Sequence, residues 1–290
     1  MLSVKEKNLC FMCIGAQKSG TTWLYEQLDK HPQVEMPPLK EIHYFDEIHR
    51  NVKTSLSARF FDKHWMNARW RKINKYLLIK LAKFNVREAK WFIRYLYSKR
   101  DWEWYDKLFQ SSEEKISGDI TPDYAVLNEN LINEIILHYP NIKVIFLMRN
   151  PVERKWSHIK MVLGEKRKRH FSEVLEEEYL FACENWKDDI GNYPETIKSW
   201  QKHVGKSNFF IGFYDDLRED PVELYRNILK FLDINPIFDE KELKKVVYGG
   251  SNASIPPEAY NIILNQKIQE IDELKRMLGN IPATWPSRNV

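Results

Sequence analysis

The sequence of 290 residues contains 43% hydrophobic and 30% charged residues, with a formal net charge of +4. This composition predicts an ordinary globular protein with a sizeable core and excludes an intrinsically disordered chain. No apolar run approaches the ~18–20 residues that a membrane span needs, and a mildly basic balance alone does not indicate a nucleic-acid partner, so we expect neither.

The cysteine count and the N-terminus bear on localisation. Three cysteines, an odd and low number for this length, are typical of a reducing compartment. The N-terminal residues lack the long apolar stretch and the small-residue cleavage site of a signal peptide. We therefore expect a cytoplasmic protein.

A glycine-rich loop lies between the first predicted strand and the first predicted helix. The apolar run NLCFMCIG (8–15) predicts a buried parallel strand, and TTWLYEQLDKH (21–31) predicts a helix. The loop begins GAQKSGTT, with Gly15 and Gly20 separated as in the triphosphate loop G-x-x-x-x-G-K-[ST]. The lysine, however, is Lys18 inside the loop, and Thr21 follows the second glycine.

The residue types of this loop suit a phosphate. A strand, a glycine loop and a helix aim backbone N–H groups and a helix dipole at an anion. Gly20 permits close approach of a ligand, Lys18 supplies a positive charge, and the ring of Trp23 is suited to stacking on a base. We predict a nucleotide site that uses Lys18, Ser19, Gly20, Thr21, Thr22 and Trp23.

The remaining chain alternates strands and helices. Strands are predicted at 143–150 and within 208–217, and helices at 152–163, at 220–234 with Asp220 as its cap, and at 257–278 with Gly279 as its end. This alternation predicts an α/β fold, a P-loop-like open parallel sheet flanked by helices, in one domain over residues 1–290.

The pattern predicts no metal site. The second strand ends in Arg149 rather than in an aspartate suited to Mg²⁺. The eight histidines show no H-x-x-x-H spacing and no nearby carboxylate pattern. Lysine and arginine without a metal carboxylate suit a nucleotide that reacts without Mg²⁺.

Two motifs together carry a family resemblance. GAQKSGTTWL with VIFLMRNPVERKWSHI resembles the sulfotransferases that use 3′-phosphoadenosine 5′-phosphosulfate (PAPS). KEIHYFD (40–46) and GDITPDYA (118–125) resemble the bacterial and glycan-modifying branch of that family, and FYDDLREDP (213–221) resembles its Tyr-Glu-Asp-Leu segment. The resemblance extends from Phe11 to about Trp285.

The resemblance implies the donor contacts. The first loop is expected to hold the 5′-phosphosulfate, Arg149 and Ser157 the 3′-phosphate, and Tyr214 to approach the adenine, leaving 3′-phosphoadenosine 5′-phosphate (PAP) as product. The late loop YGGSNASIPP departs from the family pattern because it lacks a Lys or Arg beside glycine. Ser251 and Asn252 are assigned to the 3′-phosphate or its surroundings.

The resemblance also implies a mechanism. Lys18 is expected to stabilise charge on the leaving group, and Glu41 to act as general base. His43 is the second candidate base and a substrate-binding residue. If the segment is extended, the two side chains face opposite ways. The acceptor is a hydroxyl or amine of a small molecule or sugar. The alternatives are a kinase-like nucleotide-dependent phosphotransferase and a non-catalytic nucleotide-binding interaction protein.

A basic, aromatic segment interrupts the alternation. Residues 59–100 contain 13 Lys and Arg against two acids, a balance of +11, so the rest of the chain carries 4 − 11 = −7. We expect a helical insertion or lid at about 59–107, with Trp70, Ile73, Leu77, Leu81 and Phe84 at helical spacing and a second helix near 90–97. Three interpretations remain open: a cover of the domain, a lid over the acceptor, and peripheral contact with an acidic membrane surface or polyanion.

Overall fold

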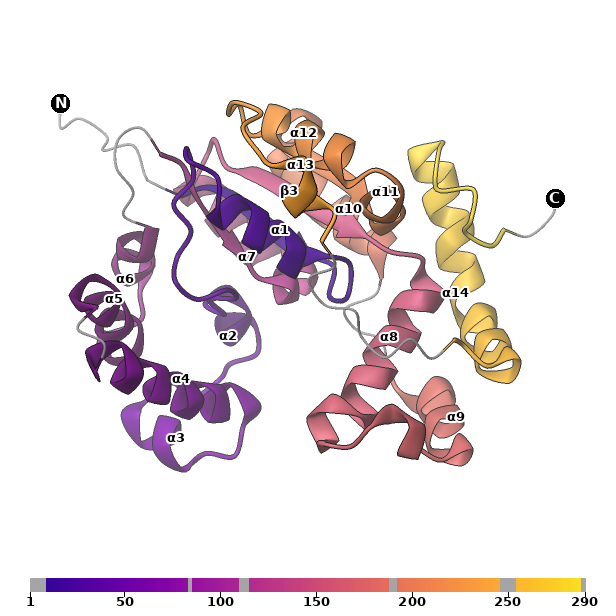
Figure 1. Ribbon diagram of the computed structural model, residues 1–290, viewed down its shortest axis with the longest axis horizontal. Helices are drawn as coiled ribbons and strands as arrows, with labels where there is room; N and C mark the ends of the chain where they lie inside the picture. Colours follow the sequence, from indigo (N-terminus) through magenta and orange to yellow (C-terminus); the bar gives the residue numbers. More distant parts are fainter. Residues whose placement is uncertain (1–8, 83–84, 110–114, 188–191, 246–253, 288–290) are drawn as a thin grey trace.

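A four-stranded parallel sheet forms the centre of the computed structural model, which describes residues 9–82, 85–109, 115–187, 192–245 and 254–287 (Figure 1). The strands lie in the order β2-β1-β3-β4, and every neighbouring pair is parallel. Their bounds are β1 (Leu9–Gly15), β2 (Ser117–Ile120), β3 (Lys143–Met148) and β4 (Phe209–Phe213). The predicted open parallel sheet is confirmed.

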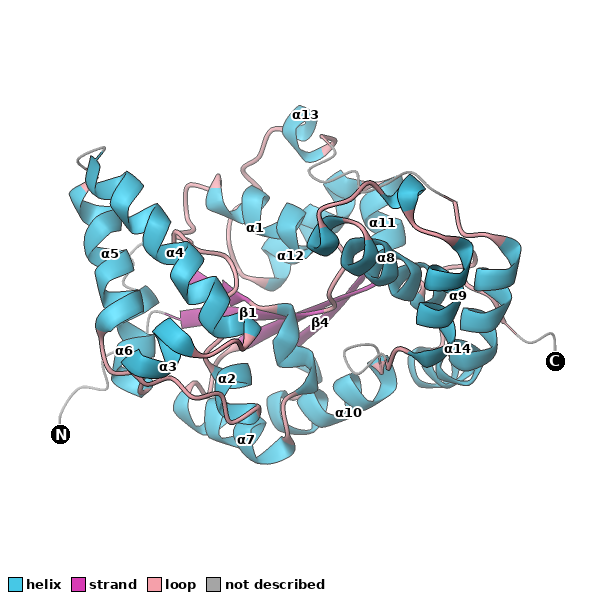
Figure 2. Cartoon of the chain, turned by 90° about the horizontal axis from the view of Figure 1, so that it is seen from below, coloured by secondary structure: helices cyan, strands magenta, loops and turns pink. Residues whose placement is uncertain are grey.

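Helices cover both faces of this sheet (Figure 2). Side chains alternate along a strand, so Phe11 and Cys13 point to one face and Met12 and Ile14 to the other. The first face packs against α1 (Thr21–Asp29) and α12 (Pro221–Phe231), and the second against α7 (Glu129–His138), α10 (Tyr193–Val204) and α14 (Pro257–Leu278). The further helices are α2 (Phe45–His49), α3 (Leu56–Phe61), α4 (Trp65–Ala82), α5 (Val86–Tyr97), α6 (Trp102–Asp106), α8 (Pro151–Leu163), α9 (Glu176–Asn185), α11 (Tyr214–Glu219) and α13 (Glu240–Leu243).

Helix ends follow the predicted signals. The side chain of Asp220 accepts a hydrogen bond from the backbone N–H of Glu223 at 3.0 Å and caps α12. Gly279, with φ of 73°, ends α14 where the periodicity ends. The strands expected at 8–15 and 143–150 are present as β1 and β3.

The insertion consists of α3 to α6, beside β2. Trp70, Ile73 and Leu77 of α4 are buried, and the indole N–H of Trp70 donates to the carbonyl of Leu96 on α5 at 3.1 Å. The predicted apolar stripe is wrong at its end, because Leu81 is 48% exposed. Phe84 lies outside the described residues.

Strand β2 was not predicted, because Ser-Gly-Asp-Ile has low strand propensity. Two tertiary contacts favour it. The buried Asp119 accepts hydrogen bonds from the hydroxyls of Tyr105, Thr121 and Tyr124 at 2.7–2.9 Å. Gly118 faces the ring of Phe11, and a Cβ there would lie 2.2 Å from two ring atoms.

We expect Gly118→Ala to lower the free energy of unfolding by about 1–3 kcal/mol, because the methyl group forces the Phe11 ring or the strand to move. Chemical denaturation measures the loss. Adding Phe11→Leu should recover part of it, giving a favourable coupling in a double-mutant cycle. Unchanged stability of the single variant would show that the strands are spaced differently at this point.

Candidate active site

The loop after β1 has a left-handed backbone conformation at two residues. Lys18 has φ of 70° and Gly20 has φ of 91°, both left-handed. A Cβ on Gly20 would lie 2.6 Å from Leu217 and 3.4 Å from Tyr214, both on α11. Glycine is therefore required here for both its φ and its space. The N-cap of α1 is Gly20, which has no side chain to cap the helix that Thr21 and Thr22 begin.

Two contacts join this loop to α8 and to Tyr193 of α10. The side chain of Gln17 hydrogen-bonds the ring of His158 on α8 at 2.8 Å. Ser19 is buried, and its hydroxyl interacts with the Tyr193 phenol without completing a hydrogen bond of normal geometry among the described residues. The Tyr193 hydroxyl in turn donates to the carbonyl of Arg149 at 3.0 Å.

Arg149 follows β3 directly and lies against Tyr214, the first residue of α11. Its guanidinium carbon is 4.5 Å from the centre of the Tyr214 ring. Its Nε and Nη2 donate to one carboxylate oxygen of Glu153 at 3.1 and 2.8 Å. The structure therefore brings together the loop, Arg149 and Tyr214, which the sequence places far apart.

A third cation joins Lys18 and Arg149. Burial lowers the pKa of Lys160 on α8, and the positive charges of Arg149 and Lys18 lower it further. Ser157 lies on the same helix, one turn before Lys160, and is partly buried. We did not predict Lys160, although its three-residue spacing from Ser157 on a helix was a usable signal. Three cations thus lie near one another at this edge, with the Glu153 carboxylate beside them.

Trp23 differs from the expectation. Its side chain is 5% exposed, its ring packs edge-on against Tyr225, and its indole N–H donates to the carbonyl of Leu243 at 3.1 Å. The ring therefore presents no open face to a base here, and stacking would require α13 to shift, so that role stays a prediction. Ser251 and Asn252 lie outside the described residues.

Glu41 and His43 do not face opposite ways, so that expectation is wrong. Both residues have left-handed φ, 65° and 54°, and the segment is therefore not extended. The Glu41 carboxylate lies 3.5 Å from Nε2 of His43 and accepts from the Lys40 ammonium at 2.6 Å. The curled backbone turns both side chains toward one place.

Electrostatics fix the charge of this pair. Burial raises the pKa of Glu41, but its hydrogen bond with His43 and the charge of Lys40 outweigh burial and hold the pKa well below its usual range. Burial lowers the pKa of His43, but hydrogen bonds with Asp46 and Glu41 outweigh it and raise the pKa to about 10. At neutral pH the pair is thus a carboxylate and an imidazolium.

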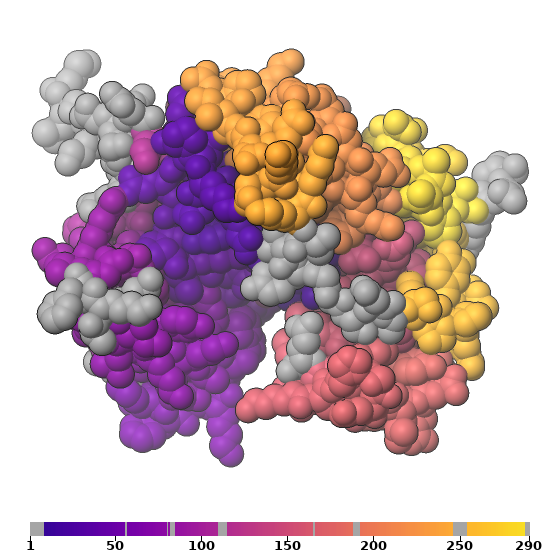
Figure 3. Space-filling model, viewed as in Figure 1, coloured from indigo at the N-terminus to yellow at the C-terminus, as the bar shows by residue number. Residues whose placement is uncertain are grey.

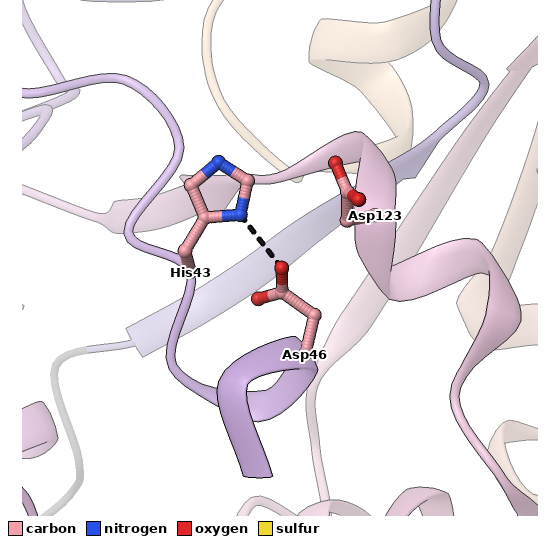
Figure 4. Close-up of side chains that lie close together, drawn as sticks. All are labelled: His43, Asp46 and Asp123. Carbon is pink, nitrogen blue, oxygen red and sulfur yellow. Dashed lines mark hydrogen bonds and ion pairs between the residues drawn. The ribbon is translucent and has the colours of Figure 1, made fainter. Parts of the chain in front are cut away.

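Carboxylates lie behind His43 (Figure 4). His43, Asp46 and Asp123 bring their ligand-type atoms within 4.8 Å of one another, and Nδ1 of His43 is 2.7 Å from Asp46. Their spacing could suit a cation. The guanidinium of Arg50, however, already contacts Asp46 at 3.3 Å and Asp123 at 2.8 Å. We read the cluster as an ion-pair network that holds His43, and its H-x-x-D spacing was a signal we missed.

The insertion contacts the Glu41 segment directly. Arg69 on α4 donates to the carbonyls of Lys40 and Glu41 at 3.0 and 2.6 Å. Tyr95 on α5 donates to the carbonyl of Ile42 at 3.1 Å. The ring of Trp65 packs edge-on against His43 with centres 5.2 Å apart.

These groups all lie at the carboxyl edge of the sheet. The glycine loop follows β1 and Arg149 follows β3. The N–H of Ile42 donates to the hydroxyl of Thr121, which follows β2, at 3.0 Å. The carboxyl edge of an open parallel sheet is where ligands bind in this class of fold.

A hollow opens beside this edge, between α3–α4 and α8–α9 (Figure 3). Trp65 is 46% exposed and leaves an aromatic ring open to solvent beside His43. A separate cavity of about 820 Å³ lies along β4 and α12, lined by five carboxylates and two lysines. An excess of negative charge makes that second cavity unsuited to a phosphate.

Comparisons with known proteins agree with this geometry. The family model described as the sulfotransferase family matches residues 11–240. The membrane-associated sulfotransferase kil1 of Dictyostelium discoideum is 29% identical over 159 residues, which are 54% of this chain and 24% of that protein. The chain thus aligns with about a quarter of that relative's length.

Solved structures share the fold. The sulfotransferase from Alicyclobacillus acidocaldarius superposes with a TM-score of 0.63 at 20% identity, covering 96% of this chain and 98% of that one. The sulfotransferase domain of the Synechococcus PCC 7002 olefin synthase gives 0.54 at 18% identity, covering 97% and 98%. With its family model matched over most of its length, the chain belongs to the sulfotransferase family.

Proposed function

We propose that this protein transfers a sulfuryl group from PAPS to a hydroxyl or amine of a small-molecule or sugar acceptor. The observation that carries the proposal is the pairing of a cation cluster, Lys18, Arg149 and Lys160, with an ionised Glu41 at the same edge of the sheet. A family member needs such a pair, because one half binds a polyanionic donor and the other accepts a proton.

The residues present fit the donor. The glycine loop and the uncapped start of α1 offer N–H groups and a buried serine hydroxyl to a phosphosulfate. Arg149, with Ser157 on α8, would hold the 3′-phosphate, and Tyr214 would lie near the adenine. When bound, PAPS supplies a sulfuryl group on a bridging oxygen that can leave as phosphate.

Two residues of the chain would assist different parts of the transfer. The acceptor oxygen or nitrogen bonds to sulfur while the bond from sulfur to the bridging oxygen breaks and its electron pair stays on the departing phosphate. Lys18 stabilises that growing negative charge. Glu41 takes the acceptor proton, which becomes strongly acidic as the new bond to sulfur forms. A carboxylate of low pKa is therefore sufficient as the base.

The surroundings of Glu41 suggest the shape of the acceptor. The exposed ring of Trp65 packs against His43, and an aromatic ring there suits a sugar ring or a flat small molecule. His43, held as an imidazolium by Asp46, would bind or orient the acceptor beside Glu41. A cytoplasmic location stays a prediction from the cysteine count.

Donor identity is testable by ligand-induced stabilisation. We expect adenosine 3′,5′-bisphosphate to raise the melting temperature without Mg²⁺, and ATP with Mg²⁺ to have little effect. Arg149→Ala should remove most of the shift because it removes a charge from the 3′-phosphate site, whereas Arg276→Ala, at an exposed position, should not. Stabilisation by ATP–Mg²⁺ alone would favour a phosphotransferase instead.

The base is testable by an isosteric change. We expect Glu41→Gln to lower kcat by about 10²–10⁴-fold, because the amide cannot accept the acceptor proton. Adenosine 3′,5′-bisphosphate should still stabilise the variant, and the exposed control Glu184→Gln should keep full activity. An acceptor screen with labelled PAPS provides the assay. Near-normal turnover in Glu41→Gln would remove Glu41 from the base role.

The charge on His43 has a consequence for pH dependence. In the wild type the pKa of Glu41 is so low that kcat should not fall in mild acid through this group. His43→Gln removes the imidazolium, so burial raises the pKa of Glu41 and kcat should decline at a higher pH as the carboxylate is protonated. The exposed control His170→Gln should keep the wild-type profile. Identical acid limbs in all three proteins would contradict the coupling.

A further inference from the structure

Exposed apolar side chains are concentrated on the insertion. Ten of the sixteen large hydrophobic residues that are exposed in the described structure lie between residues 60 and 97. Four of them form what we call the α4–α5 tip: Leu78 (65% exposed), Ile79 (49%), Leu81 (48%) and Val86 (60%). They lie within two turns of the end where α4 stops and α5 starts, and this end lies at the edge of the molecule, away from the sheet (Figure 2).

The exposed side chains of the tip are not needed to complete the hydrophobic core of the insertion. The opposite side of α4 already buries Trp70, Ile73 and Leu77 against the rest of the insertion. Lys72, Lys75 and Ile79 are exposed and recur at spacings of three and four, which places them on one outer stripe of the helix. On α5, Val86 and the exposed Lys90 are likewise four residues apart. The spacing therefore places apolar and basic residues together on the outer surface of α4 and α5.

Arginines and lysines of the insertion have different surroundings. The arginines make structural contacts: Arg59 pairs with Glu47, and Arg69 and Arg71 donate to backbone carbonyls. Lys72, Lys75 and Lys90 point outward, and none of them has an ion pair with a described residue. The arginines named here, which stabilise the fold, are thus different residues from the lysines that are open to a partner.

We propose that the α4–α5 tip docks on an anionic lipid surface. Its aliphatic side chains would enter the headgroup layer while the neighbouring lysines contact lipid phosphates and carboxylates, the arrangement of a peripheral interfacial helix. The balance of +11 in residues 59–100 against −7 elsewhere orients the molecule with this side toward negative charge. No helix of the described chain is long and apolar enough to span a bilayer.

Vesicle sedimentation of the full chain tests the proposal. Wild-type protein should pellet with phosphatidylcholine vesicles that contain phosphatidylserine, much less with phosphatidylcholine alone, and less at high salt. The variant Leu78→Gln, Ile79→Gln, Leu81→Gln should lose at least about tenfold in partition coefficient. The lysine set Lys72→Gln, Lys75→Gln, Lys90→Gln should lose up to about a hundredfold, because each of the three cations near such a surface adds roughly fivefold.

Matched controls test whether the position of the substituted residues, rather than their number and type, causes the loss of binding. The exposed aliphatic residues Leu137, Leu175 and Ile237 change to Gln in one control, and the exposed lysines Lys206, Lys230 and Lys275 in another; both should bind like the wild type. Circular dichroism melts confirm that each variant is folded. Absence of binding to phosphatidylserine vesicles at low salt overturns the proposal, as does equal loss in tip and control variants. If the wild type forms a dimer and does not bind vesicles, and the tip variant is a monomer, the surface is an interface with a second copy instead.

Discussion

The guanidinium of Arg69 holds the backbone on which the proposed chemistry depends. It donates to the carbonyls of Lys40 and Glu41, and Tyr95 donates to the next carbonyl along the chain. Left-handed φ at a glutamate is costly without such support. The insertion is thus more than a cover: two of its helices fix the direction of the Glu41 carboxylate. Nη2 of Arg69 donates to both carbonyls while Nη1 donates to the Tyr95 hydroxyl, so the planar guanidinium fixes all three groups and lysine would be a poor substitute.

The two halves of the site have opposite electrostatics. On the donor side, like charges from three elements lie close enough for Lys18 and Arg149 to lower the pKa of Lys160. On the acceptor side, charges alternate from Lys40 to Glu41 to His43 and on to Asp46. A polyanionic ligand relieves the first arrangement, whereas the second is already balanced. In the proposed mechanism the donor therefore neutralises the first group of charges, whereas the second group is already paired before an acceptor binds.

Sequence patterns predicted the sheet, its flanking helices and the glycine loop, because hydrophobic periodicity and glycine requirements are local. They could not predict β2, whose Asp119 is stabilised by hydroxyls from three separate places. They misjudged only the directions of Glu41 and His43, because an extended segment is the default, whereas the left-handed φ of this segment is accompanied by a hydrogen bond from the distant Arg69. Trp23 was read as a stacking platform because its neighbours suit a nucleotide, whereas its burial depends on Tyr225 and Leu243, some 200 residues later.

Helix α4 connects the features that the sequence left as separate alternatives. Its first residue, Trp65, contacts His43; its second turn carries Arg69 to the Glu41 backbone; its last turn carries Leu78 and Ile79 to the α4–α5 tip. An α-helix of 18 residues is about 27 Å long and nearly rigid. One helix thus carries the residues that contact the Glu41 segment and the residues of the tip that we propose to dock on lipid.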